Sequence, residues 1–322
     1  MKIIMLFPGY GSQFVGMAKE LYDESRIIQE YFEEASNCLN VNFVKLCFAS
    51  SDIELGKMPS AYTATFLVSS ALFALLKEEG IVPDAVTGYN LGEYSAIYAA
   101  GGFSFPDGLY LLNKFATFYQ ETLEKVEVAI LQIKGVPTET IEDFCYKASK
   151  GEQNVFVAIY NTEADTVVAG HADAVEYVRE WVTKNHPKAA IEDRAHEVGL
   201  HSDYMNEVAE KFALYLEKVD FKDLAYPFFV DDQRIDHGDD VKARVIDHIC
   251  MPILWDAVLS SLVDYDLIIE VGPGSMLSSM AKNKYPDKLI YAVNKRSDID
   301  NIKQLLEKTK ETSTHEVAQS EE

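Results

Sequence analysis

The chain has 322 residues, of which 48% are hydrophobic and 25% charged, as in ordinary soluble globular proteins. Its formal net charge of −23 argues against nucleic acid and anionic membranes as partners, because both are polyanions. No apolar run reaches the roughly 18–20 residues of a membrane span and no signal-peptide pattern is present, so we expect a cytoplasmic protein. The four cysteines lack paired metal-site spacing, and we expect neither a metal ion nor a cofactor.

The N-terminal part of the chain is predicted to begin with a buried strand over residues 2–7, which ends at a Pro-Gly pair. A helix is predicted from Ser12, because the following apolar residues have helical spacing. The glycines of this segment do not have the GxGxxG spacing of a dinucleotide-binding loop. Amphipathic helices are predicted within residues 25–50 and over 63–79.

A short apolar strand over residues 85–87 then runs into the sequence GYNLG, which is followed by a helix of small residues. This is the layout of a nucleophile elbow, G-x-S-x-G, in which two glycines permit a sharp turn from strand to helix. The turn presents its central side chain above the sheet at a helix N-terminus. That central residue is Asn90 and not serine.

After a helix predicted over 106–124, the element order changes. Strands are predicted at 126–134, 155–160, 166–169 and 189–191, with helices at 138–150 and 172–184. This β-α-β-β-α-β order is typical of a ferredoxin-like fold. We therefore predict a ferredoxin-like subdomain over residues 126–196, inserted into a core domain made of residues 1–125 and 197–309.

The core domain is predicted to resume with a helix over 203–218 and a strand over 226–230. A strand over 267–271 closes on Gly-Pro-Gly, and helices over 276–282 and 298–308 flank a last strand over 289–294. The polar residues 310–322 are predicted to be a disordered tail. The predicted fold class is α/β.

Five motifs mark the chain: FPGYGSQ at residues 7–13, GYNLGEYSA at 88–96, GLHSDYM at 199–205, MPILW at 251–255 and EVGPG at 270–274. Together they resemble the malonyl-CoA:acyl carrier protein transacylase family, which includes the acyltransferase domains of polyketide synthases. The resemblance covers essentially residues 1–309. It implies an α/β-hydrolase-like core of parallel strands with an inserted ferredoxin-like subdomain, and it implies acyl-CoA and acyl carrier protein as partners.

Members of that family use a serine to take the acyl group from coenzyme A and pass it to the carrier protein. The resemblance places the nucleophile at Asn90 and the base at His201. It implies that the backbone carbonyl of His248 orients the base, so that the side chain at this position need not matter. A carboxamide nitrogen cannot form the acyl ester, because its lone pair is delocalised into the carbonyl.

Other site positions implied by the resemblance are also altered. The oxyanion hole combines the backbone N–H of Leu91 with a glutamine that is Tyr10 here. The arginine that binds the malonyl carboxylate falls on Phe115, a second pocket glutamine aligns with Tyr62, and the histidine before the nucleophile is Tyr89. Taken singly, Phe115 and Tyr62 are equally typical of core aromatic residues.

Coenzyme A and acyl carrier proteins are acidic and would need a local basic face on this acidic chain. The best sequence candidate is the set of basic residues near the C-terminus, although a solvated surface is the favoured interpretation of them: Lys282, Lys284, Lys288, Lys295 and Arg296.

Three functions remain open from the sequence. The first is a pseudoenzyme of the acyltransferase family that binds or regulates acyl-CoA and acyl-carrier chemistry in fatty-acid or polyketide synthesis. The second is an active acyl-CoA:ACP acyltransferase or acyl-thioester hydrolase, in which His201 acts on a non-malonyl substrate. The third is a scaffold protein unrelated to thioesters.

Overall fold

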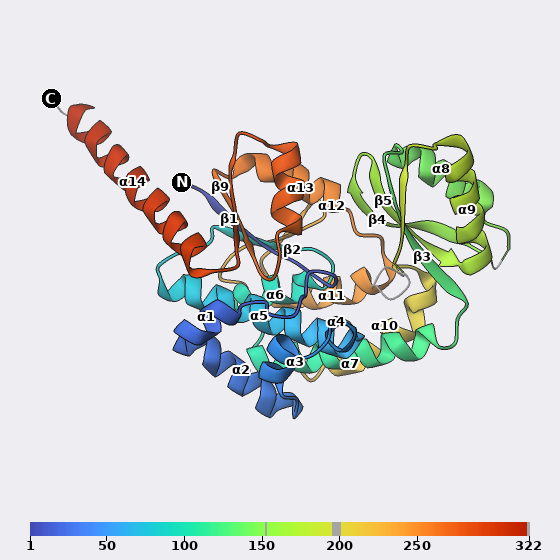
Figure 1. Cartoon of the computed structure of the whole chain (residues 1–322), viewed down its shortest axis with the longest axis horizontal. Coiled ribbons are helices and arrows are strands. Elements are labelled where there is room, and N and C mark those ends of the chain that lie inside the picture. The colour runs from blue at the N-terminus through green and yellow to red at the C-terminus, as the bar shows by residue number, and fades with distance from the viewer. Residues whose placement is uncertain (152, 195–200, 321–322) are drawn as a thin grey trace.

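The structure is a computed structural model in which residues 1–151, 153–194 and 201–320 are described, with side chains described up to residue 310. A larger part is built around a mostly parallel sheet, and a smaller part, on the right in Figure 1, around an antiparallel sheet. The chain passes into the smaller part after α7 (Phe105–Leu123) and is back in the larger part at α10 (Asn206–Leu216). The smaller part is therefore an insertion.

The main sheet has the strand order β10-β9-β1-β2-β7-β8, and all neighbours are parallel except β7 and β8. Its strands are β1 (Ile3–Phe7), β2 (Ala85–Gly88), β7 (Phe228–Val230), β8 (Gln233–Ile235), β9 (Leu267–Val271) and β10 (Leu289–Val293). β1 and β9 are buried along their whole length, as is typical of parallel strands covered on both faces. Because β1, β2 and β9 are adjacent and parallel, their carboxyl ends meet at one edge of the sheet.

Helices flank this sheet, with α5 to α7 below it and α12 and α13 above it in Figure 1. The helices of the larger part are α1 (Lys19–Glu24), α2 (Arg26–Leu39), α3 (Phe43–Ala49), α4 (Asp52–Leu55), α5 (Met58–Glu78), α6 (Gly92–Ala99), α7, α10, α11 (Gly238–Cys250), α12 (Trp255–Ser261), α13 (Met276–Lys284) and α14 (Arg296–Ser320), with 3-10 turns η1 (Asp203–Met205) and η2 (Leu262–Asp264).

Helix α5 is long and apolar enough to cross a membrane by length and composition, in contrast to the sequence-based expectation that no segment is. Its most apolar 18-residue window has a mean hydropathy of 1.4, but 83% of that window is buried inside the protein. The helix packs against α2, α6 and α7. Burial against other helices explains its apolar composition without a membrane.

The smaller sheet has the order β4-β5-β3-β6 and is antiparallel throughout, with strands β3 (Val128–Lys134), β4 (Val155–Thr162), β5 (Asp165–His171) and β6 (Ala190–Asp193). Helices α8 (Thr138–Ala148) and α9 (Ala172–Asn185) pack on one face. The element order and strand order confirm the predicted α/β fold with a ferredoxin-like subdomain.

The other face of the smaller sheet joins the core of the larger part. Ile130, Val167 and Ala169 belong to the main hydrophobic cluster rather than to the cluster under α8 and α9. Two backbone hydrogen bonds add to this contact: Tyr160 N–H donates to the carbonyl of Ile253 at 2.9 Å, and Ile253 N–H donates to the carbonyl of Ala158 at 3.0 Å. The segment before α12 thus ties the two parts together.

Two predicted helix boundaries differ from the structure. The helix expected from Ser12 begins only at Lys19, because Gly16 (φ 97°) and Ala18 (φ 58°) have left-handed backbone conformations that a continuous right-handed helix excludes. At the other end, α14 continues to Ser320 through the region expected to be disordered. This region contains no proline or glycine that would stop a helix.

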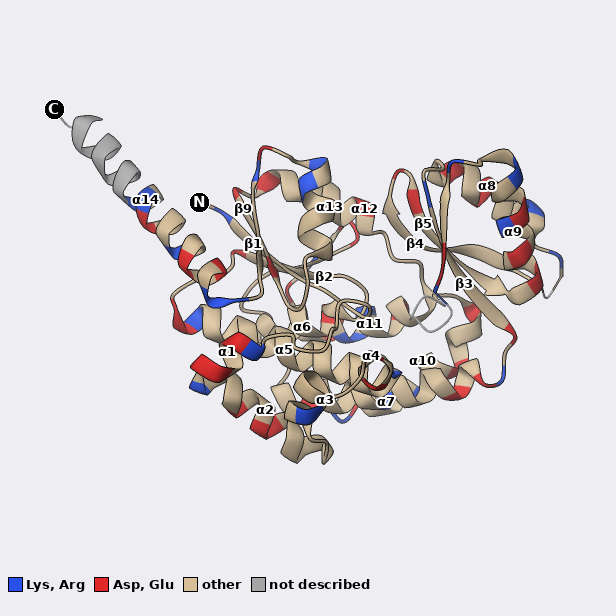
Figure 2. Ribbon diagram, in the orientation of Figure 1, with Lys and Arg blue, Asp and Glu red and all other residues tan. Residues whose placement is uncertain are grey.

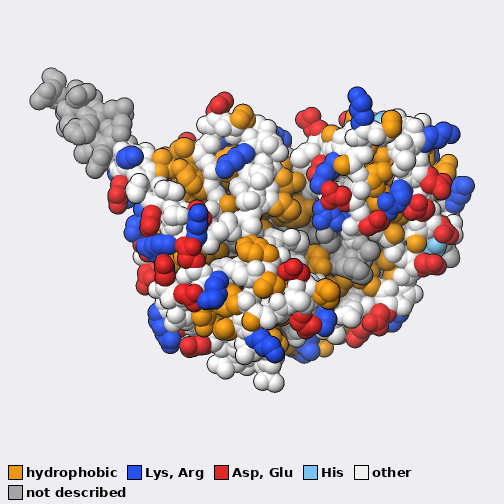
Figure 3. Space-filling view, viewed as in Figure 1, with side chains coloured by type: hydrophobic (Ala, Val, Ile, Leu, Met, Phe, Trp, Pro, Cys, Tyr) orange, Lys and Arg blue, Asp and Glu red, His pale blue; other side chains and the backbone are white. Residues whose placement is uncertain are grey.

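The basic residues near the C-terminus do not gather into a free basic face. Arg296 pairs with Glu79 at 2.6 Å and Asp300 at 3.2 Å, and Lys288 donates to the backbone carbonyl of Tyr265 at 2.6 Å. On the side shown in Figures 2 and 3, acidic and basic residues are interspersed. These contacts favour a solvated surface over a docking site.

Candidate active site

The turn between β2 and α6 has the geometry of a nucleophile elbow. Asn90, its central residue, has φ 54°, a left-handed conformation that asparagine tolerates better than most residues. A Cβ on Gly88 would lie 2.2 Å from the backbone carbon of Gly92, and one on Gly92 would lie 2.0 Å from the carbonyl oxygen of Phe7. Both glycines are therefore required, because the start of α6 packs directly on the ends of β1 and β2.

His201 lies beside this turn and lines a small cavity together with Asn90 and Leu91. Its Nδ1 is 2.6 Å from the backbone carbonyl oxygen of His248, and because a carbonyl only accepts, Nδ1 carries the proton. Nε2 is buried and has no hydrogen-bond partner among the described residues. The ring thus presents an unprotonated nitrogen, which is the form a general base needs. Gly199 and Leu200, which precede His201 in its motif, lie outside the described residues.

The pKa of His201 is lowered to about 4, mainly by burial, although the hydrogen bond to the His248 carbonyl opposes this shift. An unfolded histidine has a pKa near 6.5, so the unfolded chain binds this proton more tightly than the folded one. We expect the folded state to lose on the order of 3 kcal/mol through His201 as the pH falls from 6.5 to 4. Urea unfolding at pH 7 and pH 4.5, for wild type and His201→Gln, measures this. The variant should lose less stability on acidification, and equal losses would contradict a neutral buried imidazole.

The His248 side chain lies in a buried charged cluster, contrary to the expectation that only its backbone matters. Its Nδ1 is 2.6 Å from Glu93 Oε1 and its Nε2 is 3.1 Å from Asp231 Oδ2. Asp231 also pairs with Arg244 and accepts a hydrogen bond from the backbone N–H of Leu254 at 2.8 Å. Each ring nitrogen of His248 thus faces a carboxylate oxygen. The cluster therefore joins the elbow helix α6, through Glu93, to the residue that orients His201.

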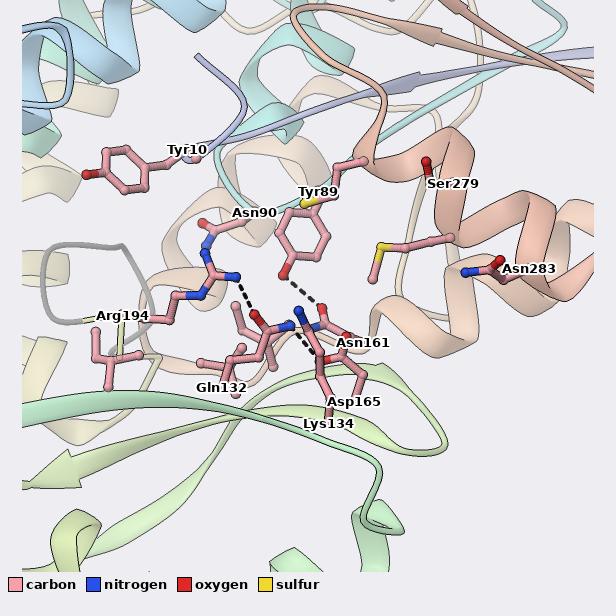
Figure 4. Close-up of a pocket in the computed structure, with 16 residues that line it drawn as sticks. Tyr10, Tyr89, Asn90, Gln132, Lys134, Asn161, Asp165, Arg194, Ser279 and Asn283 are labelled. Atoms are coloured by element: carbon pink, nitrogen blue, oxygen red, sulfur yellow. Dashed lines mark hydrogen bonds between the residues drawn. The ribbon is translucent and has the colours of Figure 1, made fainter. Parts of the chain in front are cut away.

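The Tyr10 side chain does not take the position expected for an oxyanion donor. Its hydroxyl donates to the backbone carbonyl of Gly56 at 3.1 Å and points away from Asn90 (Figure 4). Its ring packs edge-on against Tyr62, with ring centroids 5.6 Å apart. The Tyr10 side chain is longer than that of a glutamine and extends past the site to α4 and α5. The backbone N–H of Leu91 is therefore the remaining expected oxyanion donor.

Aromatic rings occupy the region where the resemblance places the carboxylate-binding arginine. Phe115 lines the small cavity and contacts three other aromatic rings, those of Phe212, Tyr119 and Tyr62, at centroid distances of 5.5, 5.9 and 6.3 Å. The cavity that remains has a volume of about 30 Å³. Phe115 is thus both a core residue and part of the cavity wall, and Tyr62 is a core residue packed behind it.

A second cavity of about 310 Å³ lies on the other side of Asn90, between the elbow and the ferredoxin-like subdomain. A chain of hydrogen bonds crosses it, drawn in Figure 4. The Tyr89 hydroxyl donates to Asn161 Oδ1 at 2.8 Å, and the Asn161 amide donates to Asp165 at 3.0 Å. Gln132 donates to the same carboxylate oxygen at 2.7 Å and accepts a hydrogen bond from Arg194.

Sequence reasoning identified Tyr89 but missed its partners in this chain. Gln132, Asn161 and Asp165 lie on or beside the strands of the subdomain, and no local motif marks them. Only the docking of the small sheet onto the elbow brings them to the cavity. No group of three or more His, Cys, Asp or Glu side chains that could hold a metal ion occurs in the described part of the chain.

Comparison with known proteins agrees with this geometry. The sequence model of the acyl transferase domain matches residues 4–287. The malonyl CoA-acyl carrier protein transacylase of Bacillus subtilis strain 168 is 34% identical over 87% of this chain and 90% of its own length. The corresponding protein of Haemophilus influenzae is 28% identical over 95% of this chain and 99% of its own.

Solved structures show the same similarity. FabD from Acinetobacter baumannii superimposes with a TM-score of 0.87 at 26% identity, covering 94% of this chain and 96% of its own. A malonyl-transacylase in complex with a type II polyketide synthase acyl-carrier protein gives the same score and identity, over 93% and 98% of the two chains. With the family sequence model, the elbow and the two-part fold in agreement, this chain belongs to the malonyl-CoA:acyl carrier protein transacylase family of acyltransferases.

Proposed function

We propose that this acyltransferase-family protein binds the phosphopantetheine arm of coenzyme A or of an acyl carrier protein, in the cytoplasm, without transferring an acyl group itself. The observation that carries the proposal is Asn90 at the centre of an intact elbow. A carboxamide cannot form the covalent acyl intermediate on which ping-pong transfer depends. In a serine protease, loss of the nucleophile costs roughly a million-fold in rate.

Two further features support a binding role. Tyr10 is turned toward Gly56, and the loss of one oxyanion donor typically costs about 100- to 1,000-fold in rate. Phe115 replaces the charge of an arginine with an apolar ring, which cannot compensate a buried carboxylate. The larger cavity nevertheless remains beside Asn90, with polar groups for a polar ligand. A structural relative solved with an acyl-carrier protein makes a carrier protein a reasonable ligand to test.

The test combines mass spectrometry with equilibrium binding. Wild type and Asn90→Ser are incubated with malonyl-, acetyl- and longer acyl-CoA and their intact masses are measured, while calorimetry measures coenzyme A binding. We expect micromolar binding and no acyl adduct for wild type. We also expect no malonyl transfer by Asn90→Ser, because Tyr10 and Phe115 remain. A covalent adduct on wild type would overturn the proposal, and absence of binding to coenzyme A and to carrier protein would favour the scaffold function.

A thioester hydrolase is the second candidate, and one observation favours it. The Nε2 atom of His201 is unprotonated, buried and beside Asn90, so it can accept a proton from a water molecule that attacks a thioester carbonyl. Release of free coenzyme A from acetyl-CoA, followed by thiol titration, distinguishes the two functions. Turnover by wild type that is lost in His201→Ala would establish the hydrolase, and equal background rates would exclude it.

A further inference from the structure

Asn90 lines both cavities of the site, the larger one of about 310 Å³ and the smaller one of about 30 Å³. The larger cavity lies toward the subdomain and has polar groups along it, whereas the smaller one lies between the elbow and Phe115 of α7. A pantetheine arm that occupies the larger cavity therefore brings its sulfur to Asn90. An acyl group attached to that sulfur would then extend into the smaller cavity.

Phe115, which lines the smaller cavity, is packed tightly among other buried aromatic rings. Phe115 is 4% exposed, and its neighbours Tyr62, Tyr119 and Phe212 are exposed by 2%, 1% and 0%. Rings packed at the density of a protein core do not swing aside without displacing others. Five further residues with apolar side chains or rings line this cavity: Leu91, Tyr94, Val245, Ile249 and Ile253.

The volume of the smaller cavity limits what can enter. A single water needs about 10–15 Å³ on this scale, so the cavity holds one or two atoms the size of a water molecule. A methyl group is of that size. The carboxymethyl part of a malonyl group and the chain of a butyryl group are larger, and neither fits without displacing Phe115.

Charge is a second reason why a malonyl group is excluded from the smaller cavity. Among the described residues that line the smaller cavity there is no lysine or arginine, and His201 is neutral with its pKa lowered to about 4. His248 also lines this cavity, but its two ring nitrogens already face Glu93 and Asp231. A malonyl carboxylate placed there would be desolvated without a free lysine or arginine partner among the described lining residues.

We propose that the site selects the bare or acetylated pantetheine thiol and rejects malonyl and longer acyl thioesters, with Phe115 as the residue that determines this selection. The inference rests on the proposed binding of the pantetheine arm and specifies which form of it is bound. A protein of this specificity would distinguish unloaded carriers from malonyl-loaded ones.

The test is calorimetric binding of coenzyme A, acetyl-CoA, malonyl-CoA and butyryl-CoA to the full chain. We expect coenzyme A and acetyl-CoA to bind within threefold of each other, and malonyl-CoA and butyryl-CoA to bind at least tenfold more weakly. If coenzyme A binds and malonyl-CoA or butyryl-CoA binds equally tightly, the selection is overturned while the proposed function stands. If coenzyme A itself does not bind, the selection falls, and the proposed function falls with it when carrier protein does not bind either.

Variants at position 115 distinguish the effect of cavity size on acyl-CoA binding from the effect of charge. The first variant is Phe115→Ala, or Phe115→Leu if the alanine variant does not fold. Its affinity for butyryl-CoA, expressed relative to its affinity for coenzyme A, should be at least tenfold higher than that of wild type. Malonyl-CoA should gain much less, because the enlarged cavity still lacks a cation. Phe105→Leu is the matched control, since Phe105 lies on the same helix, is 5% exposed and does not line the cavity. A Phe115 variant that binds butyryl-CoA no better than the Phe105 variant would contradict the proposal.

Discussion

Replacement of Asp231 by asparagine is expected to lower the free energy of unfolding by about 3–5 kcal/mol, the cost typical of breaking a buried ion pair from one side. Asp231 interacts with both Arg244 and His248, and the three side chains are only 8%, 10% and 6% exposed. Asparagine keeps the shape and tolerates the left-handed backbone of this position, where φ is 51°. The loss therefore reports on the removed charge and on the one carboxylate oxygen that the amide nitrogen cannot replace as an acceptor. Denaturant unfolding at neutral pH measures it.

Asp236→Asn is the matched control for this experiment. Asp236 pairs with Arg234 at 2.8 Å close to Asp231 in the sequence, but the two side chains are 40% and 59% exposed. An exposed pair of this kind contributes little to stability, because water screens both charges. If Asp231→Asn cost no more than Asp236→Asn, the cluster around His248 would not be a network of full charges.

Replacement of Gly92 by alanine is expected to destabilise the protein beyond the roughly 1–3 kcal/mol of ordinary overpacking. The added Cβ would lie 2.0 Å from the Phe7 carbonyl oxygen and 2.8 Å from the Phe7 carbonyl carbon. These atoms belong to the end of the buried strand β1, which cannot retreat because β2 and β9 hold it on both sides. Thermal unfolding and the soluble yield of the variant measure the effect.

Gly101→Ala separates this steric effect from backbone strain. Gly101 follows the same helix α6 and has φ 86°, but a Cβ there meets no atom within 4 Å. Its replacement should cost only the left-handed conformation, about 1–2 kcal/mol. Equal destabilisation by the two variants would show that the elbow does not depend on close contact between α6 and β1.

The sequence alone was sufficient to predict the fold class and the nucleophile elbow. Gly88 and Gly92 flank Asn90 between a strand and a helix, and this local pattern permits few backbone geometries. The ferredoxin-like subdomain was also predictable, because its strands and helices alternate with clear turn signals. Strand β8 and helix α12 were not predicted, since such short elements carry little periodicity. Helix α11 was not predicted either, although its apolar residues Val241, Val245 and Ile249 have helical spacing.

The chemical state of the site depended on contacts between distant segments. Sequence position suggested Tyr10 as an oxyanion donor, but its hydroxyl bonds to Gly56. The side chain of His248 was set aside, but Glu93, 155 residues away in the chain, binds it. Contacts of this kind cannot be predicted from local sequence spacing, because the two partners are far apart in the chain and meet only when both are buried in the folded structure.

The sequence by itself therefore determined that the chain has the transacylase fold and lacks its serine, since both follow from residue identities within short motifs. Only the tertiary structure decided that His201 is a neutral, buried imidazole and that aromatic rings leave about 30 Å³ beyond Asn90. Volume and desolvation are properties of packed surroundings. Here they depend on the packing of Phe115 and Tyr119 of α7 against Phe212 of α10. No single segment of the sequence contains this arrangement.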